Sequence, residues 1–192
     1  MSWSSLVSDG GQGCWYWEPE VYSPFTSYAM GAWNSNREPT VIMNAFSGGS
    51  SGGSGSATYV LIRNANTGLC IDGAGAASNG SAAQQWSDTN SNNQQWTVVS
   101  DGSYVRLQNR ATGLFIDGAG ATSNGSAAQQ WSGTNSNNQQ WSQVSDGSNV
   151  RFKNRATGLF LDGAGATSNG ATLEQWSDTN SSNQQWTLVT TS

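Results

Sequence analysis

The sequence predicts an all-β domain with pseudo-three-fold symmetry at residues 57–192. A segment of 45 residues occurs three times there, at about 57–101, 102–146 and 147–192. Each copy contains short runs of alternating apolar and polar residues bounded by Gly, Asn and Asp, and no run has helical periodicity. The copies are marked by one set of aspartates and two sets of tryptophans: Asp72, Asp117 and Asp162; Trp86, Trp131 and Trp176; and Trp96, Trp141 and Trp186.

Each repeat contains four predicted strands. A Thr-Gly turn, the loop GAGAASNG, the loop DTNSNN and an Asp-Gly turn separate them in the first copy. The strands of that copy are predicted at residues 59–64, 69–72, 82–87 and 94–99. Three copies therefore predict twelve strands.

The copy number indicates how the repeats assemble. One repeat is too small to bury a core alone, and a solenoid or propeller would need more copies or capping repeats. Three repeats that close on a common axis would bring their apolar side chains together at the centre. We expect Trp96, Trp141 and Trp186 to lie in this core.

The composition excludes several classes of function. The net charge is −5, and the seven Lys and Arg residues are scattered, which argues against nucleic acid or an anionic membrane surface as a partner. The chain has no His, so most hydrolase triads and zinc sites are excluded. Cys14 and Cys70 fit no zinc pattern, and a disulfide between them is not favoured. We expect no metal, no cofactor and a monomer.

A Gly/Ser segment at residues 47–56, SGGSSGGSGS, has the composition of a flexible linker. It separates residues 1–46 from residues 57–192. The polar, weakly charged composition is typical of secreted proteins, yet MSWSSLVSDGG does not have the features of a signal peptide. We therefore expect a piece of a longer, secreted protein whose export signal belongs to the missing N-terminal part.

Each repeat also carries Gln-x-Trp motifs after a strand that ends in Asp. Residues 84–86 read Gln-Gln-Trp, and residues 94–96 read the same. This pattern resembles the ricin B-type lectins and the family 13 carbohydrate-binding modules over all of 57–192. The resemblance implies a β-trefoil fold with one shallow sugar pocket in each repeat.

The resemblance also implies the residues of the three pockets. An Asp, a Gln, an aromatic platform and an Asn-Gln pair form each pocket in that family, and Glu174 takes the place of the Gln in the third repeat. The implied residues are Asp72, Gln84, Trp86, Asn93 and Gln94; Asp117, Gln129, Trp131, Asn138 and Gln139; and Asp162, Glu174, Trp176, Asn183 and Gln184.

These residue types suit a sugar, because carboxylates accept hydrogen bonds from hydroxyls, amides donate and accept, and an aromatic ring packs on C–H groups. Other interpretations stay open. The Trp86 set could be structural, the aspartates could cap turns, and the Asn-rich loops could be ordinary turns. The recurrence of the whole combination favours a binding site.

Residues 1–46 carry a second resemblance, to the last β/α unit of family 53 glycoside hydrolases, the endo-β-1,4-galactanases. The matching residues read GCWYWEP from Gly13, GAW from Gly31 and EPTV from Glu38. The resemblance implies a short N-terminal remnant of a (β/α)8 barrel, with Trp17 as a sugar platform at the end of the eighth strand. The catalytic glutamates of that family lie on strands outside this segment, so we expect no catalytic residues in the chain.

Three hypotheses follow for the function. The first is a module that binds polysaccharide and tethers an appended galactanase-like hydrolase to it. The second is a free-standing lectin for galactose-type glycans, and the third is a hydrolase. The absence of His and of a carboxylate pair for a retaining glycosidase argues against the third. Galactose-type ligands are expected from the two resemblances alone, and xylan or agar-type polymers stay open.

Overall fold

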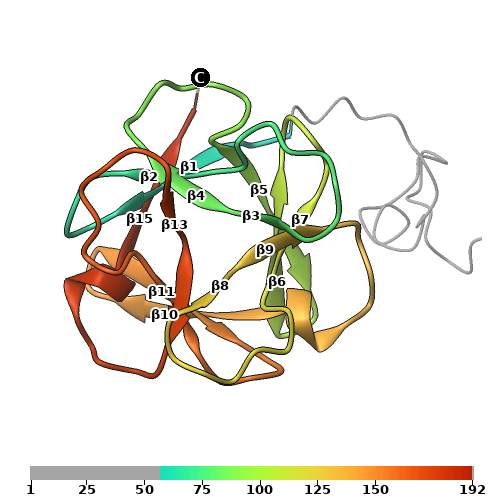
Figure 1. Ribbon diagram of the computed structural model, residues 1–192. Helices are drawn as coiled ribbons and strands as arrows, with labels where there is room; N and C mark the ends of the chain where they lie inside the picture. The colour runs from blue at the N-terminus through green and yellow to red at the C-terminus, as the bar shows by residue number, and fades with distance from the viewer. Residues whose placement is uncertain (1–56, 192) are drawn as a thin grey trace, which may run out of the picture. The chain divides into compact units, whose positions relative to one another are not determined.

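The computed structural model describes residues 57–191. They form fifteen β-strands and two short 3-10 helices, so the predicted all-β class is confirmed. Figure 1 shows the three repeats following one another around a common centre. Trp17, Cys14, the predicted linker and the predicted barrel remnant lie outside the described residues.

The repeats contain five strands each. The first has β1 (Val60–Asn64), β2 (Cys70–Asp72), β3 (Ser81–Ala82), β4 (Gln84–Trp86) and β5 (Gln95–Asp101). The second has β6 (Tyr104–Asn109), β7 (Phe115–Asp117), β8 (Ser126–Ala127), β9 (Gln129–Trp131) and β10 (Trp141–Asp146), with the 3-10 helix η1 (Asn137–Gln139). The third has β11 (Asn149–Asn154), β12 (Phe160–Asp162), β13 (Ala171–Thr172), β14 (Glu174–Trp176) and β15 (Trp186–Thr190), with η2 (Ser182–Gln184).

The first and last strands of the repeats close a barrel. These six strands follow one another around the barrel in the cyclic order β1, β5, β6, β10, β11 and β15. Each strand is paired with the other terminal strand of its own repeat on one side and with a strand of a neighbouring repeat on the other. The pairing of β1 with β15 joins the first repeat to the third over five residue pairs. Closure leaves no open edge in this ring.

The third predicted strand of each repeat is split in two, which corrects the expected twelve strands to fifteen. The segment changes partners at Ala83: β3 before it pairs with β9 of the second repeat, whereas β4 after it pairs with β2 of its own repeat and with β13 of the third. Around the pseudo-three-fold axis, Ala83 N–H donates to Ala128 C=O at 3.0 Å, Ala128 to Leu173 at 2.8 Å, and Leu173 to Ala83 at 3.0 Å. The sequence of one repeat contains no sign of this exchange between repeats.

The predicted tryptophan core is confirmed. Trp96, Trp141 and Trp186 are fully buried, and their indole N–H groups donate to the carbonyl oxygens of Ile71, Ile116 and Leu161 at 2.9, 3.2 and 3.3 Å. Each large side chain therefore fills the core without leaving its polar atom unpaired. Cys70 is a buried free thiol, as expected of a small apolar residue that replaces Phe115 and Phe160 of the other repeats.

Residues 57–191 contain no helix that is long and apolar enough to cross a lipid bilayer. Within the same residues, no three Cys, Asp or Glu side chains come together in a way that could hold a metal ion.

Candidate functional site

One tryptophan in each repeat lies on the surface. Trp86, Trp131 and Trp176 end strands β4, β9 and β14 with 36, 36 and 37% of their area exposed. They are the large hydrophobic side chains that residues 57–191 expose to solvent. Because the same partly exposed indole recurs at the same place in all three repeats, these positions are the candidate site of the domain.

Strand register places an acidic side chain beside each tryptophan. In the first repeat, Asp72 lies opposite Gln84 across the β2–β4 pair, and Gln84 shares a sheet face with Trp86. Directly opposed residues have Cβ atoms about 5 Å apart. The second and third repeats oppose Asp117 to Gln129 and Asp162 to Glu174 in the same way. The structure therefore brings the predicted Asp, Gln or Glu, and Trp together.

The aspartates are nearly buried and also cap the loop that follows. Oδ1 of Asp72 accepts a hydrogen bond from Ala74 N–H at 2.6 Å, and Ala74 has the left-handed φ of 55°. Asp117 and Asp162 do the same at 2.7 Å. The turn-cap interpretation is thus correct for one oxygen. No hydrogen bond within the described part of the chain engages the other oxygen, so it can still accept from a ligand.

Asn93 lies against the loop that follows Asp72. Its carbonyl oxygen accepts from Gly73 N–H at 2.9 Å and from the Asn109 side chain at 2.7 Å. A methyl group on Gly75 would lie 3.6 Å from both polar atoms of the half-buried Asn93 amide. Asn138 and Asn183 have equivalent positions beside Gly120 and Gly165. This set of amides therefore lies near the predicted Asp in each repeat.

The three predicted glutamines of the Asn-Gln pairs lie beneath the surface instead. Gln94 is fully buried; its Oε1 accepts from Thr89 N–H at 2.8 Å and its Nε2 donates to Ser87 C=O at 2.8 Å. Gln139 and Gln184 are also fully buried and bond in the same pattern. With both ends of the amide occupied, these side chains hold their loop in place, and the expected direct contact with a sugar is corrected to a positioning role.

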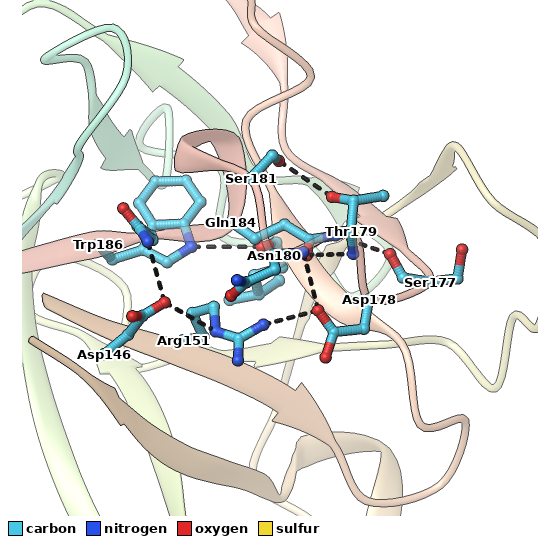
Figure 2. A network of polar contacts seen from close by, with 11 residues as sticks. Asp146, Arg151, Ser177, Asp178, Thr179, Asn180, Ser181, Gln184 and Trp186 are labelled. Carbon is cyan, nitrogen blue, oxygen red and sulfur yellow. Dashed lines mark hydrogen bonds and ion pairs between the residues drawn. The ribbon is translucent and has the colours of Figure 1, made fainter.

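The loop above Gln184 is held by a wider polar network (Figure 2). Asp178 Oδ1 accepts from Asn180 N–H at 2.9 Å and from Arg151 at 2.7 Å, while Arg151 also pairs with Asp146 at 3.2 Å. This Asx turn holds Asn180 at a φ of 50°.

The second repeat differs at this loop because Gly133 replaces the aspartate. Without a carboxylate, Arg106 donates instead to Thr134 C=O at 3.4 Å. Asn135, which corresponds to Asn180, is not among the residues with positive φ. The loop is held by the Ser136 hydroxyl, which accepts from Asn138 N–H at 3.1 Å.

A loop from the neighbouring repeat supports each exposed tryptophan. A methyl group on Gly170 of the third repeat would lie 3.6 Å from Cζ3 of Trp86 in the first. Asn169 Oδ1 accepts from both the backbone N–H and the hydroxyl of Ser87, each at 2.7 Å. This contact between repeats could not be predicted from the sequence. The tripeptide Ser-Asn-Gly recurs in all three repeats, but recurrence does not reveal which repeat it touches.

A family profile described as ricin-type β-trefoil lectin domain-like matches residues 45–131 and 137–192. The chain belongs to this ricin-type β-trefoil lectin family. No curated protein matches it.

Solved structures agree with the β-trefoil fold predicted for the lectin domain. The designed three-fold symmetric protein ThreeFoil is 32% identical, with a TM-score of 0.66, over 68% of this chain and 97% of that one. An exo-β-1,3-galactanase from Clostridium thermocellum is 28% identical, with a TM-score of 0.67, over 71% of this chain but only 31% of the enzyme. A Macrolepiota procera ricin B-like lectin, solved with lactose, has the same fold at 22% identity and a TM-score of 0.61, over 70% of this chain and 96% of that one.

The candidate site of the third repeat differs from the other two in one residue type. Glu174 stands where the other repeats have Gln84 and Gln129, directly opposite Asp162. Desolvation by partial burial, and then the neighbouring Asp162 carboxylate, raise the pKa of Glu174 above its usual value. Two of the three candidate sites thus carry the same side chains, and the third has a second carboxyl group in place of an amide.

Proposed function

We propose that the lectin domain binds carbohydrate at three shallow pockets, one in each repeat. The observation that carries this proposal is the exposed tryptophan beside an Asp and a Gln or Glu, three times in one fold. The C–H face of a pyranose packs on the indole, while its hydroxyls bond to the free carboxylate oxygen, the Gln amide and the Asn amide. Sugar-binding proteins in the same structural class, such as the lectin solved with lactose, make a carbohydrate ligand reasonable.

Each pocket alone is expected to bind weakly. Burial of a sugar face against one indole contributes roughly 1–2 kcal/mol at about 25 cal/mol per Å². Together with a few solvent-exposed hydrogen bonds this corresponds to a Kd of about 1 mM, or about −4 kcal/mol. Three pockets on one rigid body would gain avidity on a polymer that offers many sugar units.

We further propose that the domain tethers a glycoside hydrolase to plant or algal polysaccharide outside the cell. The Gly/Ser segment at 47–56 and the galactanase-like motifs around Trp17 support this proposal from the sequence. The likeness to a Clostridium thermocellum exo-β-1,3-galactanase, of which this chain spans 31%, supports it from structure. A galactose-type ligand is the first to test.

Affinity electrophoresis on galactan, xylan and agarose gels tests the binding function. We expect the intact protein to be retarded by at least one polymer and the triple variant Trp86→Ala, Trp131→Ala and Trp176→Ala to migrate freely. Circular dichroism should show that the variant is folded, because these indoles are exposed. Equal retardation of both proteins would contradict the pocket assignment.

The free-standing lectin is the second candidate, because the designed protein ThreeFoil shows that this fold exists as a whole protein. The gene sequence upstream of residue 1 separates the two candidates. An open reading frame that continues into further β/α units supports the tether, and its absence supports the free lectin. Release of reducing sugar by the purified protein would contradict both, since each assigns it binding alone.

A further inference from the structure

We infer that the third pocket is selective for a sugar that carries a protonated amine, with Glu174 as the residue that determines this selectivity. The inference rests on the proposed function and concerns one of its three pockets. A glucosamine-type unit, as found in deacetylated amino polysaccharides, is the ligand class that the charges fit.

The first step is the geometry of the two carboxylates. Glu174 and Asp162 face each other across the β12–β14 pair, at positions whose Cβ atoms are about 5 Å apart. Glu174 lies on the same sheet face as the exposed Trp176. Its Oε2 would be 3.8 Å from a methyl group on Gly125, in the loop that also lies against Trp176. Both carboxylates therefore belong to the wall of the pocket whose platform is the indole.

The second step is the lack of a compensating charge in the described residues. The ion pairs of residues 57–191 involve neither Asp162 nor Glu174. Arg151 is engaged with Asp146 and Asp178, and the Lys153 ammonium lies over the Phe160 ring at 5.7 Å. Burial, and after it the neighbouring Asp162 carboxylate, raise the pKa of Glu174.

The third step is the comparison with the other pockets. Gln84 and Gln129 occupy the Glu174 position beside equally placed aspartates and exposed tryptophans. The amide can donate to a sugar hydroxyl, whereas an ionised carboxylate cannot. At neutral pH the third pocket therefore loses a donor that suits a neutral sugar, and it gains a second acceptor that suits an ammonium. A ligand ammonium would meet two negative charges and relieve their repulsion.

The test isolates the third pocket in a protein with Trp86→Ala and Trp131→Ala. Calorimetric titration with a glucosamine trisaccharide and with its N-acetylated counterpart, at low salt and about pH 6, compares a protonated amine with a neutral amide on the same sugar backbone. We expect the free amine to bind about three- to tenfold more tightly, and added salt to reduce the difference. Equal affinities would overturn the inference.

Two further variants test whether the side chain at position 174 causes the preference for the amine. Glu174→Gln in the same background gives the third pocket the chemistry of the other two and should abolish the preference; a preference that survives would overturn the role of Glu174. The reciprocal Gln129→Glu, placed in a protein whose first and third pockets lack tryptophan, should create the preference beside Asp117.

The same measurements separate this inference from the proposed function. Neutral galactosides bound through Trp86 and Trp131, with no amine preference at the third pocket, would contradict the inference alone. Failure of every sugar to bind any pocket would contradict both. Tight binding that disappears with a chelator would overturn the inference in favour of a cation bridging the two carboxylates.

Discussion

Asn169 of the third repeat accepts two hydrogen bonds from Ser87 of the first repeat, one from its backbone N–H and one from its hydroxyl, each at 2.7 Å. Ser87 directly follows the exposed Trp86, and Gly170 directly follows Asn169 and lies against the Trp86 ring. At the two equivalent positions, Oδ1 of Asn79 and of Asn124 accepts from the backbone N–H of Ser132 and Ser177, and the side-chain amides donate to the two serine hydroxyls. Each exposed tryptophan is therefore supported by a loop of another repeat, and this support runs around the whole ring.

Asn169→Ala is predicted to weaken sugar binding at the first pocket, although Asn169 itself would not contact the sugar. Loss of the two hydrogen bonds should lower the free energy of unfolding by about 1 kcal/mol, because the site is solvent-exposed. It should also weaken sugar binding at Trp86 by about two- to fivefold, because the indole loses its support. Titration of a protein with Trp131→Ala and Trp176→Ala measures the first pocket alone.

Asn79→Ala is the matched control in that background, since Asn79 supports Trp131 of the second pocket. It should cost similar stability and leave the first pocket unchanged. If Asn169→Ala and Asn79→Ala reduced binding at the first pocket equally, the loss would reflect a general loss of stability and not the support of Trp86.

Trp131→Ala and Trp141→Ala should separate binding from folding. Trp141 is fully buried and its indole N–H bonds to Ile116 C=O, so its removal should cost about 3–5 kcal/mol. Trp131 is 36% exposed, so its removal should cost clearly less stability than removal of Trp141 while abolishing binding at the second pocket. Urea unfolding followed by circular dichroism measures the first effect. A Trp131→Ala protein as unstable as Trp141→Ala would place Trp131 in the core.

The sequence predicts the fold well because the same pattern of strands and turns occurs three times. Three copies of alternating strands determine the all-β class, and the two sets of tryptophans are sorted correctly into core and surface. The split at Ala83 could not be predicted, because it arises from hydrogen bonds between repeats around the axis. The support of Trp86 by Gly170 is also a contact between repeats, which spacing within one repeat cannot show.

The glutamines of the Asn-Gln pairs show a second limit of sequence reasoning. A Gln beside an Asn can point to solvent or inward, and the residue type does not decide between them. The structure decides for Gln139, which is buried because the backbone at Ser132 and Thr134 offers it an acceptor and a donor. Residue identity thus predicts the chemistry of a pocket more reliably than it predicts which side chain faces the ligand.

Gln139→Ala is predicted to lower the stability of the protein, with no direct effect on sugar binding. The change leaves a backbone N–H and a carbonyl group without partners in a partly buried loop, at a cost of about 1–3 kcal/mol. Gln129→Ala is the comparison, because Gln129 is half-buried beside the exposed tryptophan. It should weaken binding at the second pocket with little change in Tm. If Gln139→Ala instead reduced binding at unchanged Tm, the direct contact implied by the resemblance would be restored.

The stability difference between the natural protein and Glu174→Gln should depend on pH. Burial and Asp162 raise the pKa of Glu174 in the folded state, so between the unfolded and folded pKa values the folded protein binds more protons than the unfolded chain. The contribution of Glu174 to stability therefore falls as pH rises through its folded pKa, and Glu174→Gln should raise Tm by a few degrees at most at neutral pH. Below about pH 3 the side chain is protonated in both states, so this advantage should vanish. Thermal melts of both proteins across this range measure the difference directly, with the other carboxylates common to both. A difference in Tm that stays constant with pH would show that the Glu174 charge does not oppose folding.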